Sequence, residues 1–243
     1  CIVLCASGAP ESLELQLDRF DNGKVQVDAR KLATVSLVMN AQPHATLEFE
    51  EPARGELVAN NGVLAVGLRN GRVAIAATNG GQPRHVRQLP GLDELEGRVT
   101  LSPALAVYLS REGVLSAQSL ATGRVVWSQR PSARPIFSPI VHSSRVLFVD
   151  ERNRLVAMDA NVGGEPIWSM QLTEAPTDEP VVDGRVVRLA TRNGDVLAVD
   201  VVEGGVLDRF RIPARIASSL VPAQGAILVG TEDGRLLAVE PTS

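Results

Sequence analysis

Four arginines recur close to predicted turns, about forty residues apart along the chain. They are Arg69, Arg111, Arg152 and Arg192, and each stands shortly before a Gly or Asn. A guanidinium group stays charged and can bind a carboxylate through two parallel hydrogen bonds. We therefore expect the four side chains to occupy one repeated turn position and to form an arc that contacts an acidic or main-chain-rich partner surface. The alternative is that each is a solvated turn residue or pairs with a neighbouring repeat.

The histidines, acids and serines form no recognisable catalytic or metal-binding set. His44, His85 and His142 fall in separate repeats without HxxxH or HExxH spacing, and no GxSxG sequence surrounds a serine. Asp159 and Asp200 share one repeated position at a strand end, where an acid usually accepts hydrogen bonds from the next loop. No group of acids and Asn has the spacing of a calcium loop. We therefore predict no catalytic residue, no metal ligand and no cofactor.

The two cysteines, Cys1 and Cys5, both lie at the start of the sequence. They provide neither a disulfide framework nor a CxxC metal motif. Residues 1–9 resemble either the mature end of a lipoprotein, with the lipid on Cys1, or the apolar region and cleavage site of a signal peptide. Both interpretations predict export to the periplasm, and the first predicts a lipid anchor in a membrane. The third alternative is a sequence that simply begins at this residue.

Composition argues against nucleic-acid binding and against membrane-spanning helices. The net charge is −4 and the pI about 5.5, so no basic surface for a polyanion is expected. No apolar run approaches the ~20 residues that a helix needs to cross a bilayer. Hydrophobic residues make up 44% of the chain, which is enough for a sizeable core. The 21 Gly and 15 Pro favour many short strands separated by turns.

An internal repeat dominates the sequence. A turn followed by an apolar strand occurs five times at a spacing of 40 to 42 residues, and a weaker copy covers residues 22–28. Five copies in step cannot reasonably arise by chance. The turn residues of the five copies are Gly71, Gly113, Asn153, Gly194 and Gly234.

Each repeat divides into four short strands. In the clearest repeat they are expected at residues 135–141, 145–150, 154–159 and 166–172, without a helical period. A tight Asn-Gly or Asp-Gly turn joins the second strand to the third, and a Gly-bearing loop joins the third to the fourth. A four-stranded antiparallel sheet repeated at this spacing is the blade of a β-propeller. We therefore predict an all-β protein, a β-propeller of four-stranded antiparallel blades with about forty residues per blade.

The ends of the sequence decide the domain limits and the number of blades. We expect an N-terminal tail over residues 1–11 and a single propeller domain over residues 12–243, with the firmest repeats in 55–243. The last repeat stops after its third strand, and the alternating segment Ser12–Arg19 could supply the fourth. The same segment could instead be a strand of the weak first repeat. The two choices give five or six blades in total, and we favour six. The remaining alternative is that the chain forms only part of a larger ring.

Two repeats share Ala, a loop Gly and Trp at corresponding positions, and one adds an Asp whereas the other adds a turn Gly. In one they are Ala157, Asp159, Gly164 and Trp168, and in the other Gly113, Ala117, Gly123 and Trp127. This resembles the pyrroloquinoline-quinone-type repeat, whose pattern is a Gly turn, Ala-x-Asp, a Gly loop and then Trp. The resemblance covers residues 51–240 and weakens where Phe210 stands near the Trp position. WD repeats are a poor match, since no Gly-His or Trp-Asp pair occurs.

The resemblance implies one of two activities. Quinoprotein dehydrogenases bind the quinone and a calcium ion at the propeller centre, whereas a BamB-like branch is non-enzymatic and serves as a scaffold in outer-membrane assembly. In this family the dehydrogenases are eight-bladed rings about twice as long as this chain, often with adjacent cysteines beneath the quinone. Here Trp127 and Trp168 fall on fourth strands, where we expect them to pack between neighbouring blades. We therefore favour the non-enzymatic branch.

The expected function is that of a non-catalytic, protein-binding scaffold subunit of a bacterial envelope or membrane-associated complex. The expected partners are protein subunits and not nucleic acid, with membrane contact through a lipid on Cys1. One alternative is a degenerate quinoprotein or another small-molecule-binding propeller. A second alternative is an accessory subunit of a redox or photosynthetic membrane complex.

Overall fold

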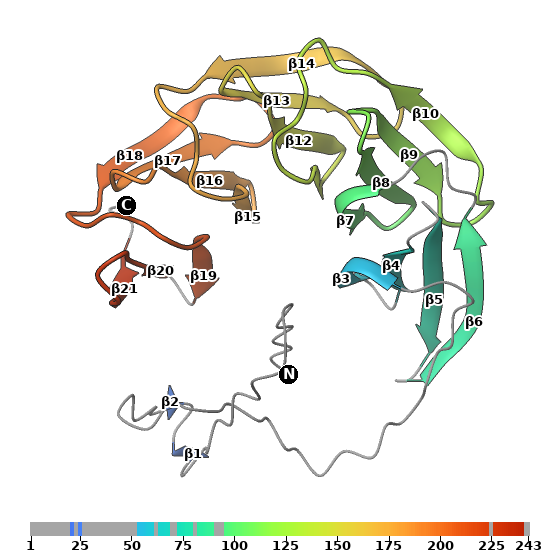
Figure 1. Ribbon diagram of the computed structural model, residues 1–243, viewed down its shortest axis with the longest axis horizontal. Coiled ribbons are helices and arrows are strands. Elements are labelled where there is room, and N and C mark those ends of the chain that lie inside the picture. The colour runs from blue at the N-terminus through green and yellow to red at the C-terminus, as the bar shows by residue number, and fades with distance from the viewer. Residues whose placement is uncertain are drawn as a thin grey trace. The chain divides into compact units, whose positions relative to one another are not determined.

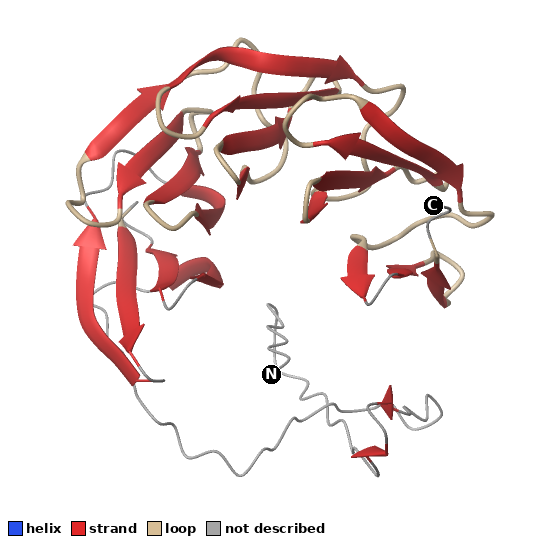
Figure 2. Cartoon of the chain, turned by 180° about the vertical axis from the view of Figure 1, so that it is seen from behind, coloured by secondary structure: helices blue, strands red, loops and turns tan. Residues whose placement is uncertain are grey.

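The computed structural model describes residues 20–21, 24–25, 53–60, 63–68, 72–79, 82–89, 95–223 and 226–240. These residues form strands and loops, and none of them belongs to a helix that is long and apolar enough to cross a membrane (Figure 2). The chain divides into two compact units, residues 1–48 and 49–243. In the first unit, β1 (Phe20–Asp21) pairs antiparallel with β2 (Lys24–Val25) at the place of the weak first repeat.

Five antiparallel sheets follow one another in chain order in the second unit, and we number them blades 1 to 5 (Figure 1). Counting the described residues, four of them have four strands and blade 5 has three. Strands that are consecutive in sequence are neighbours in each sheet, as in a propeller blade. Blade 1 contains β3 (Ala53–Asn60), β4 (Val63–Leu68), β5 (Val73–Asn79) and β6 (Gln82–Leu89), and blade 2 contains β7 (Leu95–Leu101), β8 (Leu105–Ser110), β9 (Leu115–Ser119) and β10 (Val125–Gln129). Blade 3 contains β11 (Ile140–His142), β12 (Arg145–Val149), β13 (Arg154–Asp159) and β14 (Gly163–Gln171), blade 4 contains β15 (Val181–Asp183), β16 (Val186–Ala190), β17 (Asp195–Asp200) and β18 (Val206–Arg211), and blade 5 contains β19 (Val221–Ala223), β20 (Ala226–Gly230) and β21 (Leu236–Val239).

The predicted all-β architecture of four-stranded antiparallel blades is confirmed for blades 1 to 4, and the last repeat has three strands as expected. The number of blades in the whole protein, predicted as five or six, stays a prediction. So do the limits of the tail and of the single propeller domain. Segment Ser12–Arg19, which could complete blade 5, lies outside the described residues.

The first strand of blade 3 is shorter than predicted. The sequence predicts a strand over residues 135–141, whereas β11 covers only Ile140–His142 and Pro135 forms an isolated bridge to Asp150. Pro135 and Pro139 have no backbone N–H, so this segment cannot form a continuous ladder with β12. It therefore meets its neighbour in two places with a break between them.

The turn residues adopt the backbone conformation that the repeat requires. Gly113, Gly194 and Gly234 have φ values of 80°, 93° and 80°, and Asn153 has 57°. This is the left-handed region, where Gly carries no Cβ penalty and Asn is tolerated better than most residues. The fifth turn residue, Gly71, lies outside the described residues. The predicted tight turns between second and third strands are confirmed in blades 2 to 5.

The central strands pack against two blades at once. Successive side chains of a strand point to opposite faces of its sheet. In β12, Val146 and Phe148 join a buried cluster with blade 2, whereas Leu147 and Val149 join one with blade 4. Strand β8 is buried at all six positions for the same reason. The four largest hydrophobic clusters each lie between two consecutive blades.

Two tryptophans on fourth strands connect consecutive blades. The Nε1–H of Trp127 on β10 donates to the backbone carbonyl of Ala160 in blade 3 at 2.8 Å. The Nε1–H of Trp168 on β14 donates to the carbonyl of Val201 in blade 4 at 3.1 Å. Trp127 is 8% exposed. The prediction that these rings pack between neighbouring blades is confirmed.

A glycine of the next blade lies against each indole ring. A Cβ added at Gly163 would stand 2.9 Å from Cδ2 of Trp127, and one added at Gly204 would stand 2.6 Å from Cδ2 of Trp168. Both separations are shorter than any ordinary carbon–carbon contact. The Gly loop of the repeat therefore serves two purposes: it permits a positive φ and it makes room for the ring of the preceding blade.

Blade 4 carries an acid, not an aromatic residue, at the position of these tryptophans. Each Trp faces an Ala of the third strand, and the corresponding Ala198 faces Asp208. Phe210 lies two residues further along β18, faces Val196 and packs between blades 4 and 5. Phe210 is thus near the Trp position, as the sequence suggests, but does not occupy it.

We expect Gly204→Ala to lower the free energy of unfolding more than Gly164→Ala. The two glycines have φ values of +74° and +88°, so both variants incur the left-handed cost of about 1–2 kcal/mol. A Cβ at position 164 meets nothing within 4 Å, whereas one at position 204 meets Trp168. The overpacking at 204 should add about 1–3 kcal/mol. Urea unfolding measures both values, and equal losses would contradict the docking of Trp168.

Candidate functional site

The turns between second and third strands are held by a side chain at one repeated position. The hydroxyl of Ser110 accepts a hydrogen bond from the Val114 N–H at 3.2 Å. The carboxylate of Asp150 accepts bonds from the N–H groups of Arg152 and Arg154, both at 2.9 Å. Such bonds fix a turn in one conformation. The four residues at this position in blades 2 to 5 are Ser110, Asp150, Thr191 and Thr231.

The linkers between blades are bonded to these turns. The Glu151 N–H donates to the carbonyl of Arg134 at 2.8 Å, and the Glu232 N–H donates to the carbonyl of Arg215 at 2.9 Å. We call the surface formed by the turns and these linkers the turn surface. It consists of turn residues 111–113, 151–153, 192–194 and 232–234 and linker residues 130–135, 171–176 and 211–216.

The predicted arginines do not share one turn position. Arg111 and Arg192 are the first residues of their turns, but Arg152 is the second residue of its turn and Glu151 stands first. The expectation of four equivalent arginines is therefore wrong, because the turn of blade 3 carries a Glu at that position. Arg69 lies outside the described residues.

The arginines of the turn surface also differ in their ionic partners. Arg192 pairs with the carboxylate of Glu232, the first turn residue of blade 5, and Arg215 approaches the same carboxylate at 3.6 Å. Pairing with a neighbouring repeat, the alternative set out above, thus holds for Arg192. Arg111 is exposed. Arg152 is exposed too, and its guanidinium makes no hydrogen bond or ion pair with any residue that the structure describes.

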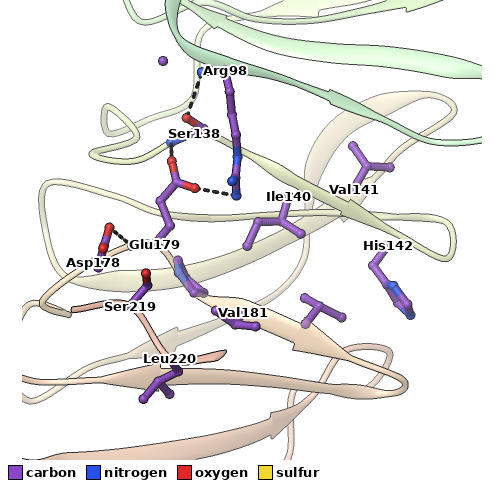
Figure 3. Close-up of a pocket in the computed structure, with 13 residues that line it drawn as sticks. Arg98, Ser138, Ile140, Val141, His142, Asp178, Glu179, Val181, Ser219 and Leu220 are labelled. Carbon is purple, nitrogen blue, oxygen red and sulfur yellow. Dashed lines mark hydrogen bonds and ion pairs between the residues drawn. The ribbon is translucent and has the colours of Figure 1, made fainter. Parts of the chain in front are cut away.

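A second candidate site is a groove of about 660 Å³ along the first strands of blades 2 to 4 and the segment before β19 (Figure 3). We call it the inner groove. Polar side chains lie toward one end, aliphatic side chains line its middle, and His142 lies toward the other end (Figure 3). Its lining residues are Gly97, Arg98, Ser138, Ile140, Val141, His142, Asp178, Glu179, Pro180, Val181, Val182, Ser219 and Leu220.

The polar end of the inner groove connects three blades. The Arg98 guanidinium of blade 2 pairs with the carboxylate of Glu179, in the segment entering blade 4, at 2.5 Å. Between them, the Ser138 hydroxyl accepts the Arg98 N–H at 3.2 Å, and the Ser138 N–H donates to Glu179 at 3.3 Å (Figure 3). The ion pair is only partly exposed, which strengthens it relative to a surface pair.

The repeated acids at the ends of third strands bond to their own loops, as predicted. Asp159 accepts the N–H groups of Asn161 and Val162 at 2.8 and 3.2 Å. Asp200 accepts those of Val202 and Glu203 at 2.8 and 2.9 Å. The Glu203 N–H, with that of Val202 and the guanidinium of Arg185, holds the pKa of the Asp200 carboxyl below its ordinary value, although burial opposes the shift. These acids close loops and are structural.

The remaining predicted residues are distributed as follows. Of the histidines, His142 lines the inner groove, while His85 lies on β6 and His44 outside the described residues. Among the residues that the structure describes, no three His, Cys, Asp or Glu side chains lie close enough together to hold a metal ion. Cys1, the candidate for lipidation, lies outside the described residues.

Arg98, Ser138 and Glu179 were not predicted from the sequence. A signal was present, because Ser138-Pro139-Ile140-Val141 and Glu179-Pro180-Val181-Val182 are equivalent segments of successive repeats. Aligning the repeats on these prolines would have placed Ser138 and Glu179 at one position. Such an alignment could not have predicted the contact of Arg98 with Glu179, because it links blade 2 to blade 4 and these are not consecutive in the sequence.

We expect Asp200→Asn to destabilise the protein at neutral pH and to have less effect in acid. A carboxyl whose pKa is lowered by folding contributes stability above its unfolded pKa and loses that contribution as the pH falls through the folded pKa. The Tm difference between wild type and variant should therefore shrink from pH 7 to about pH 3. Asp178→Asn, an exposed acid, serves as the control. A Tm difference that is independent of pH would contradict this assignment.

Comparison with known sequences gives one family. The sequence pattern of the family described as outer membrane protein assembly factor BamB matches residues 69–164 and 161–243. An outer membrane protein assembly factor BamB from Nitrosomonas eutropha (strain DSM 101675 / C91 / Nm57) is 27% identical over 138 residues. These residues are 56% of this chain but only 33% of that protein.

Solved structures share the fold. BamB from Moraxella catarrhalis aligns with a TM-score of 0.62 at 16% identity, over 80% of this chain and 61% of that chain. The computationally designed Ika8 protein aligns with a TM-score of 0.55 at 14% identity, over 76% of this chain and 57% of that chain. The chain thus spans less than two thirds of the length of each of these three proteins.

The predicted resemblance to the pyrroloquinoline-quinone-like, BamB-like repeat is confirmed by these findings. The family pattern covers residues 69–243, which is well over half of the sequence. The chain therefore belongs to the family described as outer membrane protein assembly factor BamB.

Proposed function

We propose that this protein is a non-catalytic, periplasmic scaffold subunit that binds other proteins of a bacterial envelope assembly through its turn surface. The names of its relatives support this role, since the matching family and the proteins from Nitrosomonas eutropha and Moraxella catarrhalis are called BamB, and two of these names add outer membrane protein assembly factor. The observation that carries the proposal is the exposed guanidinium of Arg152, which has no partner among the described residues and lies on a turn whose backbone is held by hydrogen bonds.

The turn containing Arg152 is held by three separate bonds. The backbone N–H of Arg152 donates to the Asp150 carboxylate, and the backbone carbonyl of Arg152 accepts a hydrogen bond from the side-chain amide of Gln171 at 3.0 Å. The Glu151 N–H donates to the carbonyl of Arg134 in the linker. A side chain on so constrained a backbone loses little conformational entropy of the main chain when it binds. The turn surface is thus preorganised for a folded partner.

The charges of the turn surface indicate the chemistry of the partner. Arg192 and Arg215 share the carboxylate of Glu232, and Arg134 pairs with Glu96. Arg134 is matched by one carboxylate, whereas Arg192 and Arg215 share a single one, so this group keeps one excess positive charge. Arg152 carries a charge without a partner among the described residues, so a carboxylate of the bound protein is its natural complement. A lipid on Cys1 would hold the scaffold at a membrane and remains part of this proposal.

The experiment is affinity purification of the protein from native membranes, followed by identification and quantification of the co-purified proteins. We expect Arg111→Glu with Arg152→Glu to reduce the recovery of the main partner by about tenfold or more, because two attractive charges become repulsive. Arg124→Glu, an exposed arginine in the loop between β9 and β10, is the matched control and should leave recovery unchanged. Equal recovery with the double variant, or an equal loss with the control, would contradict the proposal.

A further inference from the structure

The inner groove has a chemical character that its role in joining blades does not explain. We propose that it binds an extended peptide segment of a partner protein that carries a Lys or Arg side chain. This goes beyond the proposed function, because the groove lies on first strands whereas the turn surface lies at the turns between second and third strands. Three features carry the inference: unpaired strand edges, an aliphatic wall and an uncompensated carboxylate.

The first feature is the backbone of β11 and β15. Each is the first strand of its sheet, and among the strands that the structure describes it pairs only with β12 or β16. Two-residue turns join them to these neighbours, with His142 opposite Arg145 and Asp183 opposite Val186. The two residues that flank such a turn form a hydrogen-bonded pair. The residue that precedes this pair in the first strand therefore points its N–H and C=O away from the neighbouring strand, toward the free edge of the sheet.

The residues in this position are Val141 and Val182, and both line the inner groove. No residue that the structure describes forms a hydrogen bond with their backbone groups on that edge. Two strand edges facing a groove can accept an added strand through main-chain hydrogen bonds. With three residues each, β11 and β15 can each pair with about three residues of an added strand, because paired strands rise by the same ~3.3 Å per residue.

The second feature is the aliphatic middle of the groove. Ile140 and Val181 lie there half-buried, beside the more deeply buried Leu220 (Figure 3). Their remaining exposed surface would be covered by alternate apolar side chains of an added strand. A polar wall would not favour such side chains, because it already forms hydrogen bonds with water.

The third feature is the charge at the polar end. Arg98 is neutralised by Glu179, and this pair leaves no net charge. The neighbouring Asp178 is exposed, accepts only the Glu179 N–H at 2.8 Å and has no cation within ion-pair distance among the described residues. One uncompensated carboxylate beside an aliphatic wall favours a ligand with one positive charge and apolar neighbours. An anionic ligand would meet repulsion there.

The test uses the full chain, labelled with nitrogen-15, and two synthetic heptapeptides with blocked ends. Their sequence is Thr-Val-Thr-Lys-Thr-Val-Thr, with Lys replaced by Glu in the second. We expect the Lys peptide to shift the amide signals of Val141 and Val182 and to bind about tenfold more tightly than the Glu peptide. A third peptide with N-methylated valines should bind more weakly than the first, because it cannot complete the main-chain bonds.

Asp178→Asn should remove most of the preference for Lys over Glu, leaving a ratio of about twofold or less. Asp195→Asn, a half-buried acid at the start of β17 that approaches Arg211, is the control away from the groove and should preserve the preference. Equal binding of the two peptides to wild type, no binding at millimolar peptide, or signal shifts confined to the turn surface would overturn the inference. Each of these outcomes would leave the proposed function untouched, since that depends on Arg111 and Arg152.

Discussion

Burial of apolar side chains between consecutive blades is the constraint on which the structure depends. Strands such as β8 and β12 divide their side chains between two clusters, one on each side of the sheet. A blade taken alone would expose one or both of these faces to water. Blades 2 to 4 therefore need both of their neighbours, which is the general condition for the stability of repeat proteins.

Specific contacts at the fourth strands, the turns and the first strands fix this packing between several of the blades. At the fourth strand, an indole ring lies against a glycine of the next blade and donates a hydrogen bond to its backbone. At the turns, the linkers bond to the backbone of Glu151 and Glu232. At the first strand, Ser138 and Glu179 bond across successive blades. Together these contacts hold the turn surface and the inner groove in fixed geometry, which is what a binding scaffold requires.

The parts of the fold that could be predicted from the sequence depend on local chemistry. Gly113 and Asn153 identify tight turns because few other residues tolerate a positive φ, and Trp127 and Trp168 mark fourth strands because a large ring needs burial. The break after Pro135 was missed, although the missing N–H of proline gives a physical reason for it. The repeat spacing thus predicts which strands exist better than it predicts where each of them begins.

The candidate sites could be predicted only in part. The turns were located correctly, but a difference of one residue moves Arg152 to the second place of its turn and puts Glu151 where Arg111 stands in its own. The pairing of Arg98 with Glu179 depends on the curvature that brings non-consecutive blades together, and no local pattern contains that information. Charge pairing on a propeller is a property of the assembled blades, not of the repeat.

Native-state hydrogen exchange in increasing urea tests the shared cores most directly. If consecutive blades depend on one another as described, the slowest amides of β8, β12 and β16 should converge on one free energy of opening and one dependence on urea. These strands belong to three different blades, so convergence would show a single cooperative unit. Separate opening energies, with the amides of β16 exchanging while those of β8 stay protected, would contradict the account.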